Sequence, residues 1–404
     1  MREKLRKYAE LLVRAGGNVQ VGQPVVIGSD LANVEFARMV QDCAYDAGAC
    51  EVLIDWYDEA SVRTRYLRAA DEIFDDFPQW RVDRFEHYDG RGVVYLHIIS
   101  DDPDLLVGVD TDRLQRSAKV KNQKLKAHYR RTMSNELRWS MVALPSPKWA
   151  AKVFPGLDQV AAVDKLWGAL LKGSRADGAD PIADWDAHRK TFEARLKLLN
   201  ERQFGALHFS NSLGTDITIG LPKDHVWGGG GDVGKDGVPF FPNIPTEEIF
   251  TAPHRLNVNG KVVASMPLVY HGNLIEDFCI SFKDGRVVDY EAKANQELLK
   301  TIIEMDEGSH YLGEVALVAN SSPISQMGIL FYETLFDENA SSHLALGKAY
   351  PDCIKNGSKL TEDQLLKAGI NDSLTHIDFM FGTADMTVTA ADSTAIMRDG
   401  EFVI

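Results

Sequence analysis

A strand–helix–strand pattern near the start of the sequence constrains the fold more than any other feature. Pro24–Gly28 predicts a short buried strand, and Val52–Ile54 predicts a second one. Between them, residues 33–47 place apolar side chains on one helical face, and Gly48 is a suitable stop for that helix. Two strands joined by a helix form a β-α-β unit, which favours a parallel sheet covered by helices.

The rest of the first half continues this alternation of helices and strands. A helix is predicted over residues 3–15, strands over 93–99 and 141–144, and a long amphipathic helix over 183–202. Because 404 residues are too many for one ordinary domain, two domains are expected. We therefore predict an N-terminal α/β domain with a parallel sheet over residues 1–202.

The second half, from residue 203 onward, is dominated by strand patterns. Strands are predicted over residues 206–209, 216–219, 278–282, 286–290, 375–381, 386–389 and 401–404, and one helix over 294–306. Asp284 and Gly285 lie between two of these strands, and Asp-Gly is a strong hairpin signal. The sequence therefore predicts a C-terminal α+β domain, mostly antiparallel and rich in β-strands, over residues 203–404.

The glycine run Gly228–Gly231 is the one segment that resembles a nucleotide-binding loop. It lacks the spacing and the Ser or Thr of a phosphate-binding loop, and no G-x-G-x-x-G follows the first predicted strand. We interpret the run as a mobile loop, because consecutive glycines favour irregular structure.

The charge balance of the chain excludes some classes of partner. Asp and Glu number 59 against 44 Lys and Arg, so the formal net charge is −15, which disfavours nucleic acid and anionic membranes as partners. Neither a secretory signal pattern nor an apolar run of about 20 residues is present. The cysteines are scattered without a C-x-x-C pair, which is typical of reduced thiols in a cytoplasmic protein.

A candidate metal site in the second half would have to be assembled from separate segments, because the sequence has no H-E-x-x-H and no paired C-x-x-C. His376 and Asp378 lie two residues apart in a predicted strand, so both would project from the same face. An imidazole beside a carboxylate suits a divalent transition metal. The alternative is an ordinary His–Asp pair on the surface.

Three further segments supply carboxylates and a second histidine. Glu314 begins an apolar strand, where a buried carboxylate is costly unless it is paired or bound to a metal. Glu338 and His343 lie five residues apart in a stretch of small polar residues, which predicts a tight loop. Glu247 and Glu248 are adjacent in a segment that two prolines restrict, so only one of them can face a given side if the segment is extended. The alternatives are an exposed strand end, an exposed polar turn and the first turn of a helix, respectively.

Together these segments bring several carboxylates and two histidines into one domain. Two divalent ions about 3.5–4 Å apart require a set of this kind, with one carboxylate bridging them. The residues alone therefore indicate a carboxylate–histidine metal cluster in the C-terminal half.

Four long motifs, in order and at matching spacing, resemble those of the M29 metallopeptidases, the thermophilic-type aminopeptidases. They are Asn243–Pro253, Gly313–Val318, Glu338–Ala345 and Thr375–Gly382, and the resemblance continues more weakly through Asn135–Trp139 and Pro145–Ala150. The resemblance implies these metal ligands: Glu248, Glu314, Glu338, His343, His376 and Asp378. Glu338 could instead orient His343 rather than bind metal.

The resemblance also implies an activity for the C-terminal domain, which would then be the catalytic one. The expected function is release of N-terminal amino acids from short peptides, with two divalent ions (zinc, cobalt, manganese or magnesium), by a homodimer. The family's conserved tyrosine corresponds to Tyr350, which would donate a hydrogen bond to the developing oxyanion. Either Glu248 or Glu314 would transfer the proton to the leaving amine, and the sequence does not choose between them.

Two other functions use the same residue types. A phosphoesterase or an amidohydrolase can also employ two metal ions, although few Lys or Arg lie near the motifs to hold a phosphate. A non-catalytic assembly protein stabilised by metal is the second alternative, but carboxylate-rich sites without cysteine are less typical of structural zinc.

Overall fold

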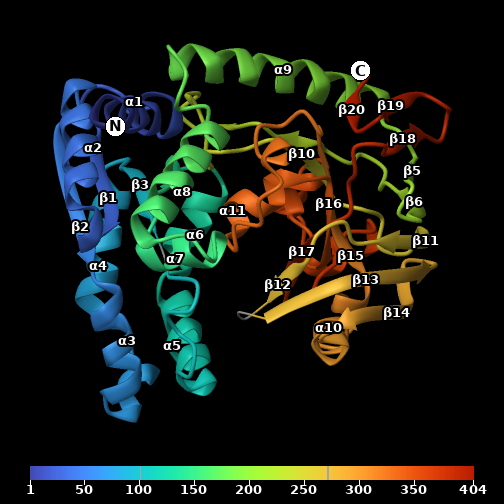
Figure 1. The fold of residues 1–404 in the computed structure, drawn as a ribbon, viewed down its shortest axis with the longest axis horizontal. Helices are drawn as coiled ribbons and strands as arrows, with labels where there is room; N and C mark the ends of the chain where they lie inside the picture. Colours follow the sequence, from blue (N-terminus) through green and yellow to red (C-terminus); the bar gives the residue numbers. More distant parts are fainter. Residues whose placement is uncertain (101, 271–272) are drawn as a thin grey trace. The chain divides into compact units, whose positions relative to one another are not determined.

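The structure is a computed structural model that describes residues 1–100, 102–270 and 273–404 (Figure 1). Within these residues the contacts divide the chain into two compact units. Unit 1 comprises residues 1–187 and 231–245, and unit 2 comprises residues 188–230 and 246–404. The domain boundaries expected from the sequence, 1–202 and 203–404, stay a prediction.

The sheet of unit 1 is parallel throughout, as the β-α-β pattern predicts. Its strands are β1 (Pro24–Asp30), β2 (Glu51–Tyr57), β3 (Val94–Ile99) and β4 (Trp139–Ala143), in the order β2-β1-β3-β4. Helix α2 (Val34–Asp46) connects β1 to β2 and buries Phe36 and Val40 in the core of the unit. Since a parallel connection requires a crossover, the helical face of residues 33–47 fixes this topology.

Helices make up most of the remainder of unit 1. They are α1 (Arg2–Leu11), α3 (Glu59–Arg68), α4 (Gln79–Asp89), α5 (Thr111–Lys124), α6 (Lys126–Met133), α7 (Pro147–Val153) and α8 (Gln159–Gly173). The segment 231–245 adds the short strands β8 (Asp232–Val233) and β9 (Pro239–Phe240), which pair with each other. Helix α9 (Pro181–Arg202) begins in unit 1 and ends in unit 2.

The larger sheet of unit 2 is antiparallel, and its order is β12-β13-β11-β6-β5-β18-β19-β20, with β14 pairing β13. Its strands are β5 (Ala206–Ser210), β6 (Asp216–Gly220), β11 (Val258–Val263), β12 (Leu268–Tyr270), β13 (Asn273–Lys283), β14 (Arg286–Ala294), β18 (Thr387–Ala390), β19 (Ala395–Arg398) and β20 (Glu401–Phe402). The predicted hairpin is confirmed, because Asp284 and Gly285 join β13 to β14. Helix α10 (Gln296–Ile303) follows this hairpin, within the predicted range 294–306.

The smaller sheet of unit 2 is also antiparallel and has the order β17-β16-β15-β10-β7. Its strands are β7 (Gly228–Gly229), β10 (Glu248–Thr251), β15 (Leu312–Val318), β16 (His343–Gly347) and β17 (His376–Met380). All the motifs that carry candidate ligands reach this sheet or the short helix α11 (Thr334–Asp337) and the turn Glu338–Ala340 that follows it.

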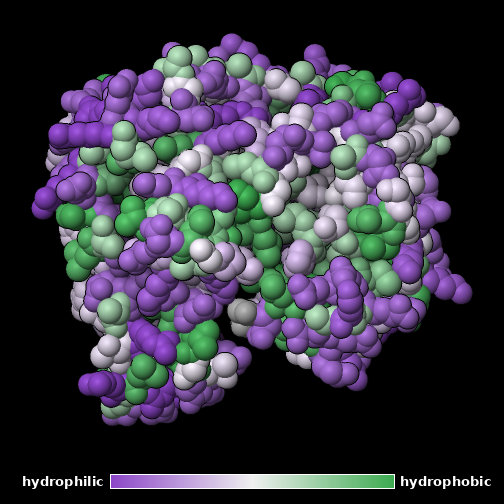
Figure 2. Space-filling view, in the orientation of Figure 1, coloured by the Kyte–Doolittle hydropathy of each residue, from purple (hydrophilic) through white to green (hydrophobic). Residues whose placement is uncertain are grey.

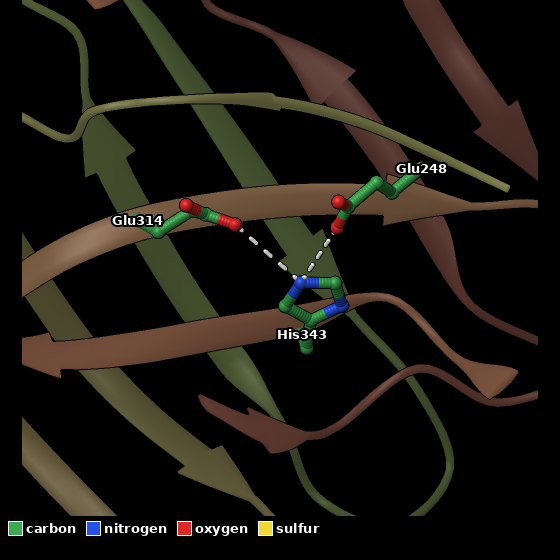
Figure 3. Close-up of side chains that lie close together, drawn as sticks. All are labelled: Glu248, Glu314 and His343. Atoms are coloured by element: carbon green, nitrogen blue, oxygen red, sulfur yellow. Dashed lines mark ion pairs between the residues drawn. The ribbon is translucent and has the colours of Figure 1, made fainter. Parts of the chain in front are cut away.

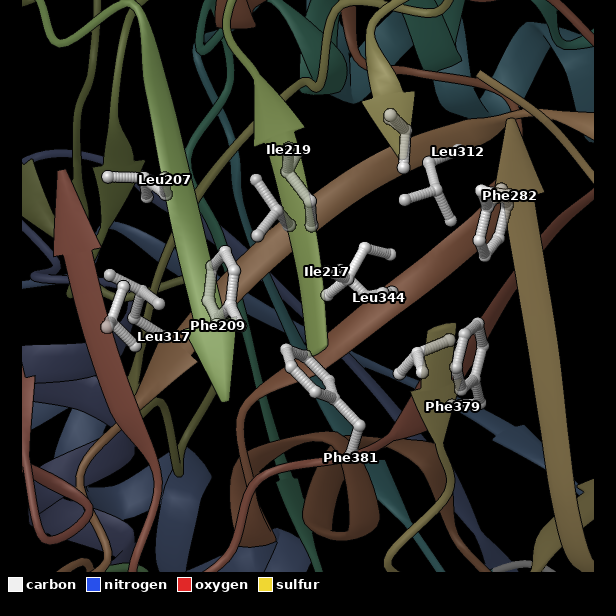
Figure 4. Close-up of a cluster of buried hydrophobic side chains, with 14 of the residues drawn as sticks. Leu207, Phe209, Ile217, Ile219, Phe282, Leu312, Leu317, Leu344, Phe379 and Phe381 are labelled. Carbon is white, nitrogen blue, oxygen red and sulfur yellow. The ribbon is translucent and has the colours of Figure 1, made fainter. Parts of the chain in front are cut away.

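The two sheets of unit 2 share one hydrophobic core. Leu207, Phe209, Ile217 and Ile219 of the larger sheet belong to the same buried cluster as Leu317, Leu344 and Phe379 of the smaller one (Figure 4). One face of the smaller sheet is therefore apolar, which leaves the other face for the polar side chains of its strands.

Two sequence predictions about local structure are wrong. The glycine run is not a free loop, because Gly228 and Gly229 form β7 and pair with β10. A side chain at Gly229 would collide with the backbone of Glu248, so the glycine permits the close approach of this strand. The segment from Glu338 to His343 is not a loop throughout, since Glu338 begins a helical turn and His343 begins β16.

The face of the molecule drawn in Figure 2 is mainly hydrophilic. Figure 2 shows hydrophilic residues over most of the visible face, with scattered apolar patches between them. In the described part of the chain, none of the helices has the length and apolar character that crossing a bilayer requires.

Candidate metal centre

Five of the six candidate ligands, all except Glu338, lie on strands of the smaller sheet of unit 2 and project on the side away from its core. Strand pairing places Glu314, Ala345 and Asp378 side by side across β15, β16 and β17, and it pairs His376 with Gly347. The residues between them, such as Leu344 and Phe379, belong to the core. The alternation of side chains along a strand thus separates a polar face from an apolar one.

A β-bulge at Gly313 determines which way Glu314 points. Leu312 and Val315 both belong to the core although they are three positions apart along the strand, an offset that normally puts two side chains on opposite faces. The pairing with β16 shifts between Leu312 and Glu314. One extra residue in a strand reverses the direction of the side chains that follow it. Without the bulge, Glu314 would point into the core beside Leu312.

Residues with small side chains leave room around the candidate ligands on this face. Ala316 lies beside His343, and Ala345 lies between Glu314 and Asp378. Larger side chains at these two positions would fill the volume that the carboxylates and imidazoles face.

The first group of candidate ligands is Glu248, Glu314 and His343 (Figure 3). His343 Nε2 lies 3.0 Å from Glu248 Oε2 and 3.5 Å from Glu314 Oε1. His343 is 1% exposed and Glu314 is 5% exposed, so the group is shielded from bulk water.

The second group is Glu314, His376 and Asp378, so Glu314 belongs to both groups. His376 Nε2 lies 3.8 Å from Glu314 Oε2 and 3.4 Å from Asp378 Oδ1. The two carboxylate oxygens of Glu314 therefore face different imidazoles, Oε1 toward His343 and Oε2 toward His376. This is the arrangement that a bridging carboxylate requires.

Backbone carbonyls fix the orientation of both imidazoles. His343 Nδ1 lies 3.1 Å from the carbonyl oxygen of Ser341, and His376 Nδ1 lies 2.6 Å from that of Lys348. Because a carbonyl oxygen only accepts, each Nδ1 carries the hydrogen, and in the neutral ring Nε2 then presents a lone pair. Histidines that ligate metal usually have such a partner on the other ring nitrogen.

Burial and mutual repulsion perturb the acids of this centre. Desolvation raises the pKa of Glu314 to about 7, with the carboxylates of Glu248 and Asp378 adding to the rise and His343 opposing it. Desolvation and the same two carboxylates raise the pKa of Glu338 well above its usual value. The centre thus concentrates negative charge that a cation would neutralise.

The pKa values of the two imidazoles are raised as well, by the carboxylates that surround them. Burial alone would lower the pKa of His343, but Glu248 and Glu314 raise it well above the usual value. Burial also disfavours the charged form of His376, yet Asp378 and Glu314 raise its pKa to about 9. Each imidazole thus lies between carboxylates that attract positive charge.

The residues present fit a divalent metal ion. Glu248 Oε2 and Asp378 Oδ1 are buried and, among the described residues, have no hydrogen-bond partner, although an imidazole nitrogen lies near each. Buried carboxylate oxygens without hydrogen bonds are costly unless an ion coordinates them. A donor set of carboxylate oxygens and imidazole nitrogens suits zinc and other first-row divalent ions.

Three other predicted residues lie near this centre in different ways. Glu338 belongs to neither ligand group, but it lines a cavity together with His376 and Asp378. The ring of Tyr350 lies 5.1 Å from that of His376, centroid to centroid. Glu247 turns away from the ligand groups and lies 3.8 Å from His188 of α9, so the structure brings Glu248, not Glu247, into the cluster.

Two residues that hold the centre together, Asn339 and Gly313, were not expected from the sequence. Asn339 is 1% exposed, accepts a hydrogen bond of 2.6 Å from the Glu247 amide and donates one to the Leu335 carbonyl oxygen. The bulge at Gly313 could have been predicted, because a glycine inside an apolar strand pattern is a known signal for a bulge. The role of Asn339 depends on a contact across 92 residues and left no local signal.

An α/β unit together with a β-rich unit that presents two overlapping carboxylate–histidine groups defines a metal-dependent hydrolase. The chain belongs to the family of thermophilic metalloproteases (M29), whose sequence profile matches residues 1–402. The family predicted from the motifs is therefore confirmed, and with it the use of divalent metal and the metallopeptidase class.

Individual relatives agree with this assignment over nearly their whole length. Aminopeptidase AmpS of Bacillus subtilis (strain 168) is 42% identical over 96% of this chain and 94% of that protein. Aminopeptidase T of Thermus thermophilus is 37% identical over 100% of this chain and 99% of that protein. The solved structure of wild-type AmpT from Thermus thermophilus matches with a TM-score of 0.91 and 36% identity, covering 100% of both chains, which confirms the predicted fold.

Proposed function

We propose that this chain is an aminopeptidase that uses two divalent metal ions to release N-terminal amino acids from short peptides. The observation that carries the proposal is Glu314, whose two oxygens face His343 and His376 in two overlapping ligand groups. The relatives named aminopeptidases support the peptide substrate.

The proposed ligands are those implied by the motifs: Glu248, Glu314, Glu338, His343, His376 and Asp378. Glu248 and His343 would hold one ion, His376 and Asp378 the other, and Glu314 both. Glu338 either completes one ion's ligand set or orients its neighbours, and its place in the shared cavity is compatible with both. When bound, divalent ions supply Lewis acidity to a water molecule and to the scissile carbonyl.

The protein's own residues would perform the remaining steps. Tyr350, beside His376, would donate a hydrogen bond from its hydroxyl to the oxyanion that develops on the carbonyl oxygen. Glu314 or Glu248 would pass the proton from the attacking water to the leaving amine. The carboxylates that surround these groups would attract the free amine of the peptide.

Chelation and a single substitution test the two-metal proposal. Aminoacyl-p-nitroanilides are assayed with added metal, after chelation, and with Glu314→Gln, while bound metal is counted by elemental analysis. We expect chelation to abolish hydrolysis, and Glu314→Gln to lower both bound metal and kcat/KM by roughly 100-fold or more. Glu276→Gln, an exchange at an exposed residue of β13, is the matched control and should behave as wild type.

Two results would contradict the proposal. Chelator-resistant activity, or full activity in Glu314→Gln, would eliminate the two-metal site. Hydrolysis of p-nitrophenyl phosphate without hydrolysis of peptides would instead assign the centre to a phosphoesterase.

The assembly and location of the enzyme belong to the same proposal. We infer a homodimer, zinc, cobalt, manganese or magnesium as the ions, and a cytoplasmic location. The free thiols of Cys43, Cys50, Cys279 and Cys353 support a reducing compartment. Analytical ultracentrifugation measures the oligomeric state, and activity regained after chelation with each ion in turn measures the metal preference.

A further inference from the structure

A cavity of about 260 Å³ opens beside the candidate metal centre. Glu338, His376 and Asp378 line one side of it. The lining also includes apolar side chains, among them Leu268 of β12 and Leu330, besides the acidic residues Glu333 and Asp337. A molecule held at the metal centre would therefore have an apolar recess next to it.

Strand geometry connects the recess directly to the ligands. Met380 lines the same cavity and follows His376 and Asp378 at two-residue intervals on β17. Since alternate residues of a strand share a face, the sulfur-containing side chain continues the row of ligands on the same side of the sheet. The change from metal-binding to apolar surface thus takes place within one strand.

Hydrogen bonds fix the wall formed by residues 330–337. Asp337 Oδ1 accepts a hydrogen bond of 2.7 Å from the Phe331 amide, and Asp337 Oδ2 accepts one of 3.1 Å from the Glu333 amide. Glu333 Oε2 in turn accepts a bond of 2.8 Å from the Leu335 amide. The wall is therefore preformed, and it adds the acidic side chains of Glu333 and Asp337 to the lining of the recess.

A second cavity of unit 2 differs in the residues that line it. It has a volume of about 310 Å³, and its lining includes Leu213, Ile324 and Met386 but none of the candidate ligands. The smaller cavity is therefore the one that a group attached to a metal-bound substrate can enter.

We propose that the cavity lined by Leu268, Leu330 and Met380 receives the side chain of the substrate's first residue, favouring large apolar side chains and rejecting acidic ones. This inference rests on the proposed aminopeptidase function. Apolar walls stabilise a leucine, methionine or phenylalanine side chain through the surface they remove from water. A carboxylate side chain would lose its hydration on entry and would face the acidic side chain of Glu333.

Substitutions at Leu330, which is partly exposed, test the assignment. The kcat/KM values of the metal-loaded enzyme are compared for leucyl-, alanyl- and glutamyl-p-nitroanilide. We expect wild type to prefer leucyl over alanyl by about tenfold or more, the range that apolar pockets give. Leu330→Trp fills the cavity and should lower this ratio at least about tenfold while alanyl turnover persists. Leu330→Arg should raise glutamyl relative to leucyl turnover by a similar factor.

A matched substitution and a binding measurement make the test decisive. Leu213→Trp places the same bulk in the neighbouring cavity and should leave the leucyl-to-alanyl ratio unchanged. Calorimetry with free L-leucine, the expected product, should show binding to wild type and to Leu213→Trp, and weaker binding to Leu330→Trp by at least about tenfold.

The outcomes separate this inference from the function on which it rests. If wild type hydrolyses none of the substrates, the proposed function fails, whatever the variants do. If wild type is active but Leu330→Trp and Leu330→Arg leave all ratios unchanged, or Leu213→Trp changes them instead, the cavity assignment is overturned. If circular dichroism shows that Leu330→Trp is unfolded, the smaller exchange Leu330→Ala replaces it. Leu330→Ala should raise the kcat/KM for phenylalanyl- relative to leucyl-p-nitroanilide. An unchanged phenylalanyl-to-leucyl ratio would also overturn the assignment.

Discussion

Asn339 connects two of the segments that carry candidate ligands. Its side-chain oxygen accepts a hydrogen bond from the Glu247 amide, next to Glu248, while its own backbone adjoins Glu338. Its amide group donates to the Leu335 carbonyl oxygen at 2.9 Å, which fixes the side chain from the other end. The separation between Glu248 and Glu338 therefore depends on one buried side chain.

We predict that Asn339→Ala weakens metal binding more than it weakens the fold. Loss of the asparagine leaves the buried Glu247 amide without its acceptor, which should lower the free energy of unfolding by about 1–3 kcal/mol. Because the Glu247 amide is no longer fixed, the adjacent Glu248 should be less well positioned as a ligand. The protein should then bind metal about 10- to 100-fold less tightly, as measured by competition with a chelating dye.

A second asparagine provides the control for this prediction. Asn200 of α9 also accepts one amide hydrogen bond and donates another, both with Trp227, and it lies outside the ligand segments. Asn200→Ala should lower stability comparably and leave metal affinity within about twofold of wild type. Equal metal affinities for Asn339→Ala and wild type would show that Asn339 has only a structural role.

Residues of the centre differ in how far local sequence predicts their placement. His376 and Asp378 were expected on one strand face because their spacing is local, and His376 Nε2 lies 3.4 Å from Asp378 Oδ1. The choice of Glu248 over Glu247 depends on where the strand begins and on His188 of a distant helix, which no local pattern contains. The assignment of all these residues as ligands stays a prediction until metal is measured.

Among the strands, β15 shows how one irregular residue positions the centre. The bulge at Gly313 allows Leu312 to remain in the core while Glu314 faces the other side of the sheet. A Cβ atom at residue 313 would collide with the carbonyl oxygens of Gly347 and Lys348, the latter being the oxygen that orients His376. Gly313 therefore influences both the carboxylate and one imidazole.

We predict that Gly313→Ala disturbs the second ligand group. The added methyl should push the Gly347–Lys348 backbone away and lower the free energy of unfolding by roughly 1–3 kcal/mol, as overpacking does. Displacement of the Lys348 carbonyl should also release His376, so bound metal should fall below wild type when measured by elemental analysis. Gly205→Ala is the control, because a Cβ atom there meets open space. Metal content equal to wild type in a folded Gly313→Ala would contradict this role for the bulge.

The regular elements were largely predictable, and the irregular ones were not. Residues 33–47 and 183–202 carry long helical patterns, and each matches a helix of the structure within a few residues. Strands β7 and β12 have two and three residues, which is too short for any period to appear. The paired glycines of β7 form a strand only because β10 supplies hydrogen bonds from elsewhere in the chain.

At the scale of the whole molecule, helix α9 decides where the chain can be divided. Its second half contributes Phe192 and Leu199 to the core shared by the two sheets of unit 2, where they are 2% and 0% exposed. The predicted division after residue 202 would remove both side chains from that core. The compact unit instead begins at residue 188, although the chain returns to unit 1 for residues 231–245.

We predict that a fragment of residues 188–404 is more stable than a fragment of residues 203–404. Loss of a buried phenylalanine or leucine costs about 2–5 kcal/mol, and loss of both Phe192 and Leu199 approaches the entire stability of a typical domain, about 5–15 kcal/mol. Urea unfolding followed by tryptophan fluorescence should therefore show a cooperative transition for residues 188–404, and a midpoint at much lower urea, or no transition, for residues 203–404. The fragment 188–404 carrying Phe192→Ala should fall between the two. Equal midpoints for the two fragments would mean that α9 adds nothing to the catalytic unit, and that the boundary at residue 202 is the one at which this chain divides.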